Sequence, residues 1–317
     1  MMKYAAVLFL FSAFFILSGK EEGFSPEEMR KAMEFADPAF YRGALDSPAR
    51  YSAQLRGGWE HVAERVKNPS HPRHASAVRL FARIYDEVQT GLHWKIPVAE
   101  VSVPYLETPP DIDGTAGERE WADAVVFREE YLLNRTEPLK DIRSVWRVGW
   151  SGKNLYAAAE FRDPEVAAYR GRFDTPDETP LYLGDAFELF IRPDEKSLLY
   201  YEYLVNPESE LWSLVHINDP RGSWIRICDD FPTGAKCAAR RTADGYAVEL
   251  CIPLAEQYGP WWNRGPRAGD RFRMMMVRTD RTGGAYTRTV PVPLLYEGHN
   301  IFGYMKAVLE PGKSKKD

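Results

Sequence analysis

Two hydrophobic periods divide the chain near residue 95. Before it, apolar residues recur every three or four positions, as in Leu55, Trp59, Val62 and Val66, which is the spacing of an amphipathic helix. After it, apolar and polar residues alternate in short runs separated by Gly, Pro, Asp and Asn, which is typical of strands. The pattern predicts a helical segment over 20–95, a β domain over 96–311 and a polar tail over 312–317.

Three helices are expected in the N-terminal segment. The first begins at Ser25-Pro26-Glu27-Glu28, where Ser caps the helix, Pro suits its first turn and the acids lie near the positive end of the dipole. The second covers 51–66 and the third about 75–88, separated by the turn residues 68–72. The simplest interpretation is a small helical layer packed on the main domain.

The alternating runs predict many short strands with no long helix between them. Such a pattern favours an antiparallel β-sandwich of the immunoglobulin-like or jelly-roll type. A hairpin is expected where residues 242–245 (Thr-Ala-Asp-Gly) separate two runs. The expected strands are 98–104, 145–150, 155–161, 187–191, 200–205, 238–241, 246–252, 272–277, 287–292 and 301–309.

The first 19 residues have the pattern of a secretory signal peptide. Lys3 precedes an uncharged apolar run from residue 5 to 17, and the small residues Ser18 and Gly19 follow. The run is short for a bilayer span. We therefore expect cleavage near Gly19, a secreted or periplasmic protein, and no stable membrane span afterwards. An uncleaved membrane anchor is the alternative.

Composition narrows the class of ligand. The net charge is −5 and no basic stripe is visible, so we expect no nucleic-acid partner. Nine Trp and seventeen Tyr suit both strands and surfaces that stack on flat ligands. Three cysteines match no zinc site; Cys228 and Cys237 could close a short disulfide loop, and Cys251 is expected to be a buried thiol.

Five segments, taken in order, carry a family resemblance. They resemble carbohydrate-binding module family 9, within the DOMON-like β-sandwich superfamily, over roughly residues 96–310. The segments are 110–114 (Pro-Asp-Ile-Asp-Gly) followed by 120–124, 145–156 followed by Asp163-Pro164, 184–191, 246–253 and Phe302-Gly303. The resemblance implies a β-sandwich that serves as a non-catalytic binding module.

The resemblance also implies a sugar clamp. A site of the family holds a terminal sugar between two aromatic rings, which fall here on Tyr182 and Tyr296. Glu188 stands where the family places a sugar-contacting acid, and strand alternation directs it away from the face of its apolar neighbours. Rings stack on the apolar faces of a sugar, and fixed polar groups bind its hydroxyls.

One position departs from the family pattern. Leu204 stands where the family often has an Arg, so the charged hydroxyl donor is missing. Glu202 or Arg192 could compensate, and Asn206 could contribute an amide. Further stacking candidates are Trp212, Trp224 and the loop pair Trp261-Trp262; the alternative for the loop pair is that both rings tuck under the edge of the sandwich.

A calcium ion is expected to be structural if it binds. Acid-rich turns near Asp111, Asp113, Asp163 and Asp185 offer the oxygen ligands that calcium prefers. No cofactor is otherwise required.

The sequence therefore predicts a secreted, non-catalytic carbohydrate-binding protein that supports glycan degradation beside partner enzymes. One alternative is a haem or redox sandwich, with ligands near 274–276 (Met-Met-Met), although core filling is the simpler interpretation of these residues. Others are an accessory part of a glycoside hydrolase acting on O-glycosyl bonds, and a structural surface module without ligand.

Overall fold

A computed structural model describes residues 23–37, 39, 49–90, 98–166, 181–195, 197–219, 223–229, 234–257, 259–261, 264–281, 285–295 and 297–312. The expected signal peptide lies outside these residues, as does the tail from residue 313. Among the helices that are described, none combines the length and apolar character needed to cross a bilayer.

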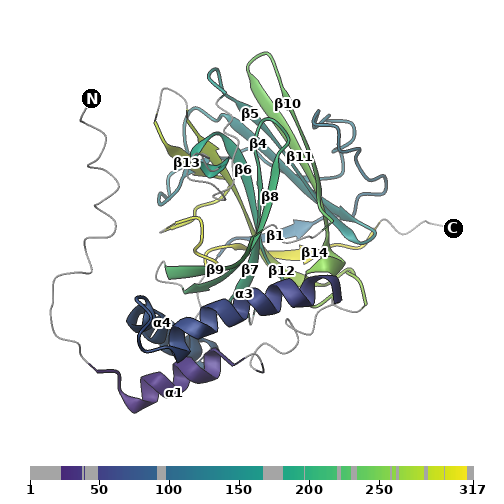
Figure 1. Cartoon of the computed structure of the whole chain (residues 1–317). Helices are drawn as coiled ribbons and strands as arrows, with labels where there is room; N and C mark the ends of the chain where they lie inside the picture. The colour runs from purple at the N-terminus through teal and green to yellow at the C-terminus, as the bar shows by residue number, and fades with distance from the viewer. Residues whose placement is uncertain are drawn as a thin grey trace, which may run out of the picture.

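The N-terminal segment forms α1 (Pro26–Phe35), α3 (Ala49–Lys67) and α4 (His74–Thr90). The predicted start of α1 is correct, because Ser25 and Glu28 form a reciprocal capping box. Figure 1 shows the three helices together at one end of the β domain.

A close backbone contact joins the helices to the β domain. A Cβ on Gly58 of α3 would lie 1.5 Å from the carbonyl oxygen of Ile227 in β9 (Ser223–Asp229), so only glycine fits there. Next to it, the Trp59 indole is enclosed and donates to the Ala36 carbonyl at 3.0 Å. The helical layer and the sheet therefore share one hydrophobic core.

Two sheets form the predicted sandwich. Among the described residues, all strand pairs are antiparallel except β1 with β14, which is parallel. The larger sheet has the order β1 (Glu100–Val103), β14 (Met305–Leu309), β12 (Arg271–Asp280), β6 (Ala186–Arg192), β7 (Leu199–Val205), β8 (Leu211–Asp219) and β9, with β13 (Thr287–Val290) joining β12 to β3 (Tyr131–Leu132). The smaller sheet has the order β10 (Lys236–Arg241), β11 (Gly245–Pro253), β5 (Asn154–Arg162), β4 (Ser144–Ser151) and β2 (Val125–Phe127).

The larger sheet is covered on both faces at its centre. Every residue of β6 and β7 is buried. Phe187 faces the core between the sheets, where its ring lies 6.2 Å from that of Trp146. Phe190 points to the outer face, where it contacts Tyr200 and Tyr304. Alternation thus places a second set of buried side chains on the outer face, and that face carries the candidate site.

Candidate functional site

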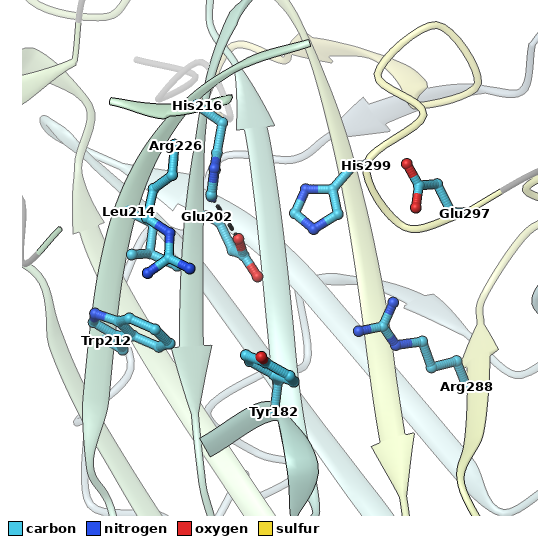
Figure 2. Close-up of a pocket in the computed structure, with 9 residues that line it drawn as sticks. All are labelled: Tyr182, Glu202, Trp212, Leu214, His216, Arg226, Arg288, Glu297 and His299. Carbon is cyan, nitrogen blue, oxygen red and sulfur yellow. Dashed lines mark hydrogen bonds and ion pairs between the residues drawn. The ribbon is translucent and has the colours of Figure 1, made fainter. Parts of the chain in front are cut away.

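The outer face of the larger sheet holds a pocket of about 200 Å³. Figure 2 shows Trp212 and Arg226 on one side, Arg288 and His299 on the other, and Glu202 between them. The pocket thus combines aromatic rings, guanidinium groups, imidazoles and carboxyl groups in one hollow. Its lining residues are Tyr182, Glu202, Trp212, Leu214, His216, Arg226, Arg288, Glu297 and His299.

Strand pairing fixes the floor of this pocket. Glu202 in β7 lies opposite Leu214 in β8, and His216 in β8 lies opposite Arg226 in β9. Because side chains two residues apart share a face, Leu214 and His216 point the same way. Glu202, Leu214 and His216 therefore stand on paired strands rather than on loops.

Three titratable side chains meet at this floor. Nε2 of His216 lies 2.7 Å from Oε2 of Glu202. The rings of His216 and His299 lie 5.3 Å apart at 73°. The Tyr200 hydroxyl bonds Nδ1 of His299 at 2.7 Å. All of these side chains are buried, so their mutual contacts replace those with water.

Burial shifts the pKa of several groups in the pocket in the direction that favours the neutral form. It raises the pKa of Glu202, although His299, Arg288 and Arg226 oppose the shift. It lowers the pKa of His299 to about 3, so this imidazole is neutral at neutral pH. Burial also raises the pKa of Glu297 and of the Tyr182 phenol. The pocket is a desolvated environment in which added hydrogen bonds or charges have strong effects.

A guanidinium reaches this face from an unexpected strand. Leu204, at the position of the family's Arg, pairs directly with Glu188 across β6 and β7. Arg288 from β13 approaches Glu188 to 4.0 Å. Burial disfavours charge on Arg288, but Glu188, Tyr286 and Glu202 more than offset it and raise its pKa. Arg288 therefore places a positive charge near the position that Leu204 leaves apolar.

Arg192 does not take that role. Its guanidinium donates to the carbonyls of Ser197 and Glu195 at 2.6 and 2.5 Å, and it stacks on the Phe302 ring. The prediction that Arg192 compensates for Leu204 is wrong, because these contacts hold it away from the pocket. Glu202 lines the pocket, as an acid rather than as a replacement donor.

The aromatic lining comes from two elements. Tyr182 lies half-buried in the 3-10 turn η4 (Leu181–Leu183). Trp212 is almost fully enclosed, and the Arg226 guanidinium lies 5.1 Å from its ring centre. Tyr182 is thus the more accessible of the two rings.

Glu188 occupies the same face without reaching the pocket lining. It points away from the core side of Phe187, as alternation predicts, but it is fully buried rather than open to solvent. It accepts a hydrogen bond from the Thr279 hydroxyl at 2.7 Å, and burial raises its pKa. Glu188 thus lies next to the Arg288 guanidinium behind the pocket, where it raises the pKa of Arg288.

Two expected binding residues are engaged elsewhere. The Asn206 amide donates to Glu210 and accepts from the backbone of Glu208 and Glu210, so it closes the turn between β7 and β8. Trp261 has no exposed surface and packs against Phe272. Neither side chain is presented to a ligand, which corrects the sequence-based expectation for both.

Other expected stacking residues fall outside the description. Tyr296 and Trp262 lie outside the described residues, and the side chain of Trp224 is not described. Met274, Met275 and Met276 are all fully buried in the hydrophobic core, consistent with core filling.

The predicted acid-rich turns separate into two groups. Asp163 and Asp185 meet Asp280, with carboxylate oxygens within 4.8 Å of one another. Arg278 bonds Asp163 and Asp280 at 3.2 and 2.8 Å, so a guanidinium already supplies positive charge there. Asp113 instead binds Thr115 within its own turn. The four acids therefore do not form one calcium site, and calcium binding stays a prediction for each group.

Sequence reasoning missed most of the pocket. No motif or regular spacing in the sequence links His216, His299, Arg226 and Arg288, so none of them was predicted. Alternation within 211–219 would have placed Trp212, Leu214 and His216 on one face. No sequence signal indicates that residues 297–299 fold back over that face.

The fold and the pocket place the chain among β-sandwich domains that carry a mixed aromatic and polar pocket on one outer face. The family described as "Carbohydrate family 9 binding domain-like" matches residues 112–290, which is more than half of the chain. The chain belongs to this family, as its sequence resemblance implied. A comparison with curated proteins gave no match.

Solved structures show similar folds at low sequence identity. A "putative carbohydrate-binding protein" from Bacteroides uniformis ATCC 8492 is 11% identical, with a TM-score of 0.52 over 68% of this chain and 100% of that one. A family 9 carbohydrate-binding module from Caldicellulosiruptor kristjanssonii, in complex with cellotriose, is 17% identical, with a TM-score of 0.45 over 68% of this chain and 95% of that one. The complex of a family 9 module from the same organism with glucose is also 17% identical, with a TM-score of 0.44 over 69% of this chain and 98% of that one.

Proposed function

We propose that this protein binds carbohydrate, without catalysing a reaction, in the pocket between Tyr182 and His299. The observation that carries the proposal is the combination of a partly exposed aromatic ring with fixed polar groups on a family 9 fold. A sugar offers an apolar face to Tyr182 and hydroxyls to Arg288, Arg226 and Glu202.

The size of the pocket favours a single sugar unit. Its volume of about 200 Å³ is below the roughly 300–1,000 Å³ of pockets for drug-sized ligands. We therefore propose recognition of a terminal or free sugar, with any remaining chain directed to solvent. Tyr296 is proposed as the second ring because Glu297, its neighbour in the chain, lines the pocket.

The cellular role is proposed from the sequence. The N-terminal apolar run supports export to the periplasm or beyond, where the protein would hold glycan near degrading enzymes. Neither carbohydrate binding nor the proposed role beside degrading enzymes requires a cofactor. A structural calcium ion at the acid-rich turns remains part of the proposal, and calcium titration of the unfolding temperature tests it.

Calorimetric titration of the full chain with glucose, cello-oligosaccharides and a wider glycan panel tests the function. We expect Tyr182→Ala to weaken binding about tenfold or more, because it removes the stacking surface (about 1.4 kcal/mol). Tyr182→Phe keeps the ring and should retain most of the affinity.

Tyr85→Ala, in the helical layer, is the matched control and should bind as the parent does. Binding that is unchanged when Tyr182 and Tyr296 are both replaced by Ala would refute this site. A glycan panel without any binder would refute the function.

A further inference from the structure

The cluster on the pocket floor has the composition of a metal site. Glu202 comes from β7, His216 from β8 and His299 from the segment before β14. One ligand atom from each lies within 4.8 Å of the others, and all three side chains are buried. We propose that Glu202, His216 and His299 bind a divalent transition-metal ion, with Zn²⁺ the best fit. The inference does not rest on carbohydrate binding.

The donor set selects the class of ion. Two imidazole nitrogens and one carboxylate oxygen suit Zn²⁺ and its first-row neighbours, whereas Ca²⁺ and Mg²⁺ prefer oxygen alone. Ligand atoms around tetrahedral Zn²⁺ lie roughly 3.3 Å apart, given bonds of about 2.0–2.1 Å. The Glu202–His216 contact of 2.7 Å need open only slightly to admit the ion.

The side chains around the cluster orient its histidines. The Tyr200 hydroxyl bonds Nδ1 of His299 at 2.7 Å. The Tyr200 ring also stacks on His216 at 5.0 Å and 25°. Hydrogen bonds of this kind fix the ring orientation of metal-binding histidines and tune their affinity. The cluster is thus held in place before any ion binds.

Charged groups of both signs surround the cluster. Three carboxyl groups, Glu188, Glu202 and Glu297, face two guanidiniums, Arg226 and Arg288. The two guanidiniums repel a cation, and the carboxyl groups attract one in their ionised form. An ion would also offset the cost of burying Glu202.

Because the cluster opens into the pocket, the ion would keep a coordination position for a ligand. Three protein ligands with an open fourth position are the arrangement of reactive or ligand-binding zinc sites, as opposed to closed structural ones. Sugar hydroxyls, or another oxygen ligand, could fill that position. The metal would therefore link the floor of the pocket to what it binds.

Zinc titration of the chelator-treated full chain, by calorimetry and by the visible d–d absorption of Co²⁺, tests the site. We expect one Zn²⁺ ion per chain at this cluster, and excess Ca²⁺ should not displace it. Glu202→Gln keeps the shape and the hydrogen bond but removes the charge, and should weaken Zn²⁺ binding at least about tenfold. His299→Gln should do the same. His61→Ala, an exposed histidine on α3, is the matched control and should bind as the parent does.

Circular dichroism checks that each variant is folded. Absence of stoichiometric uptake, or equal uptake by Glu202→Gln and the parent, would overturn the metal site. Equal loss in His61→Ala would also overturn it, since the ion would then bind elsewhere. Sugar titration of the metal-free and zinc-loaded protein is a separate readout: zinc uptake without sugar binding would refute the proposed function and leave the metal site standing.

Discussion

Each sheet carries a buried carboxylate on its outer face, and the two carboxylates have different surroundings. Glu249 in β11 accepts hydrogen bonds from the backbone of Asp113, Gly114 and Ala116, and from the Trp121 indole. These four donors use the whole acceptor capacity of a carboxylate. Glu202 in β7 instead meets His216 beside an open pocket. The first arrangement is closed and the second can accept a ligand.

This contrast shows which part of the structure the segments that resemble family 9 build. The matching segments 110–114, 120–124 and 246–253 converge on Glu249, so they close the sandwich rather than form its ligand site. All nine residues that line the pocket lie outside the segments that carry the resemblance. The resemblance therefore identifies the architecture more securely than the ligand.

The largest expected effect is loss of stability at Glu249. Glu249→Ala leaves four donors, three of them buried, without their acceptor and should lower the free energy of unfolding by about 3–5 kcal/mol. Glu202→Gln should change it by less than about 1 kcal/mol, because the amide keeps the shape and can still accept from His216. Urea unfolding followed by tryptophan fluorescence measures both. Equal losses would contradict the distinction between the two carboxylates.

A smaller loss is expected at Gly114, which presents its N–H to Glu249. Its φ is +85°, and a Cβ there would lie 2.8 Å from the backbone of Ala239. Gly114→Ala should therefore cost about 1–3 kcal/mol of stability through strain. Thermal unfolding measures this loss, and ligand affinity in the pocket should not change. Gly152→Ala is the control with a similar positive φ but no near neighbour, and it should cost less.

Substitutions of two arginines in the larger sheet should separate an effect on ligand binding from an effect on stability. Arg288→Ala removes a guanidinium from the pocket and should weaken ligand binding about tenfold, or about 1.4 kcal/mol. Arg192→Ala removes the contacts to Ser197 and Glu195, so it should lower stability and leave affinity nearly unchanged in the folded fraction. Calorimetry paired with thermal unfolding measures both. The reverse pattern would show that the pocket lies elsewhere.

The smallest effect concerns the pH dependence of stability. Burial raises the pKa of Glu188 in the folded state above its usual value. Its contribution to stability is therefore fully present below pH 4.5 and is lost as pH rises through the folded pKa. Glu188→Gln, which stays neutral, should match the parent near pH 4 and gain relative stability toward pH 8. Urea unfolding across this range measures the difference; a gain toward low pH would contradict the assignment.

Local patterns predicted the three helices and ten of the described strands, but not β2, β3, β8 or β9. The capping residues Ser25 and Glu28 gave the start of α1, and the alternation around Glu188 gave its face on β6. The same patterns misplaced Trp261, because a loop composition of Gly, Pro and Asn says nothing about what covers the loop. Asn206 was misassigned for a similar reason: a turn amide serves its own backbone before it serves a ligand.

The amino-acid order by itself determined the helical segment, the strand periods and the family, since these depend on neighbours a few residues apart. Only the tertiary structure decided the pocket. Glu202, His216 and His299 are separated by up to 97 positions (299 − 202), and β-pairing with the return of the C-terminal segment brings them together. Long-range pairing reflects the packing of the whole chain, and no short stretch of sequence records it.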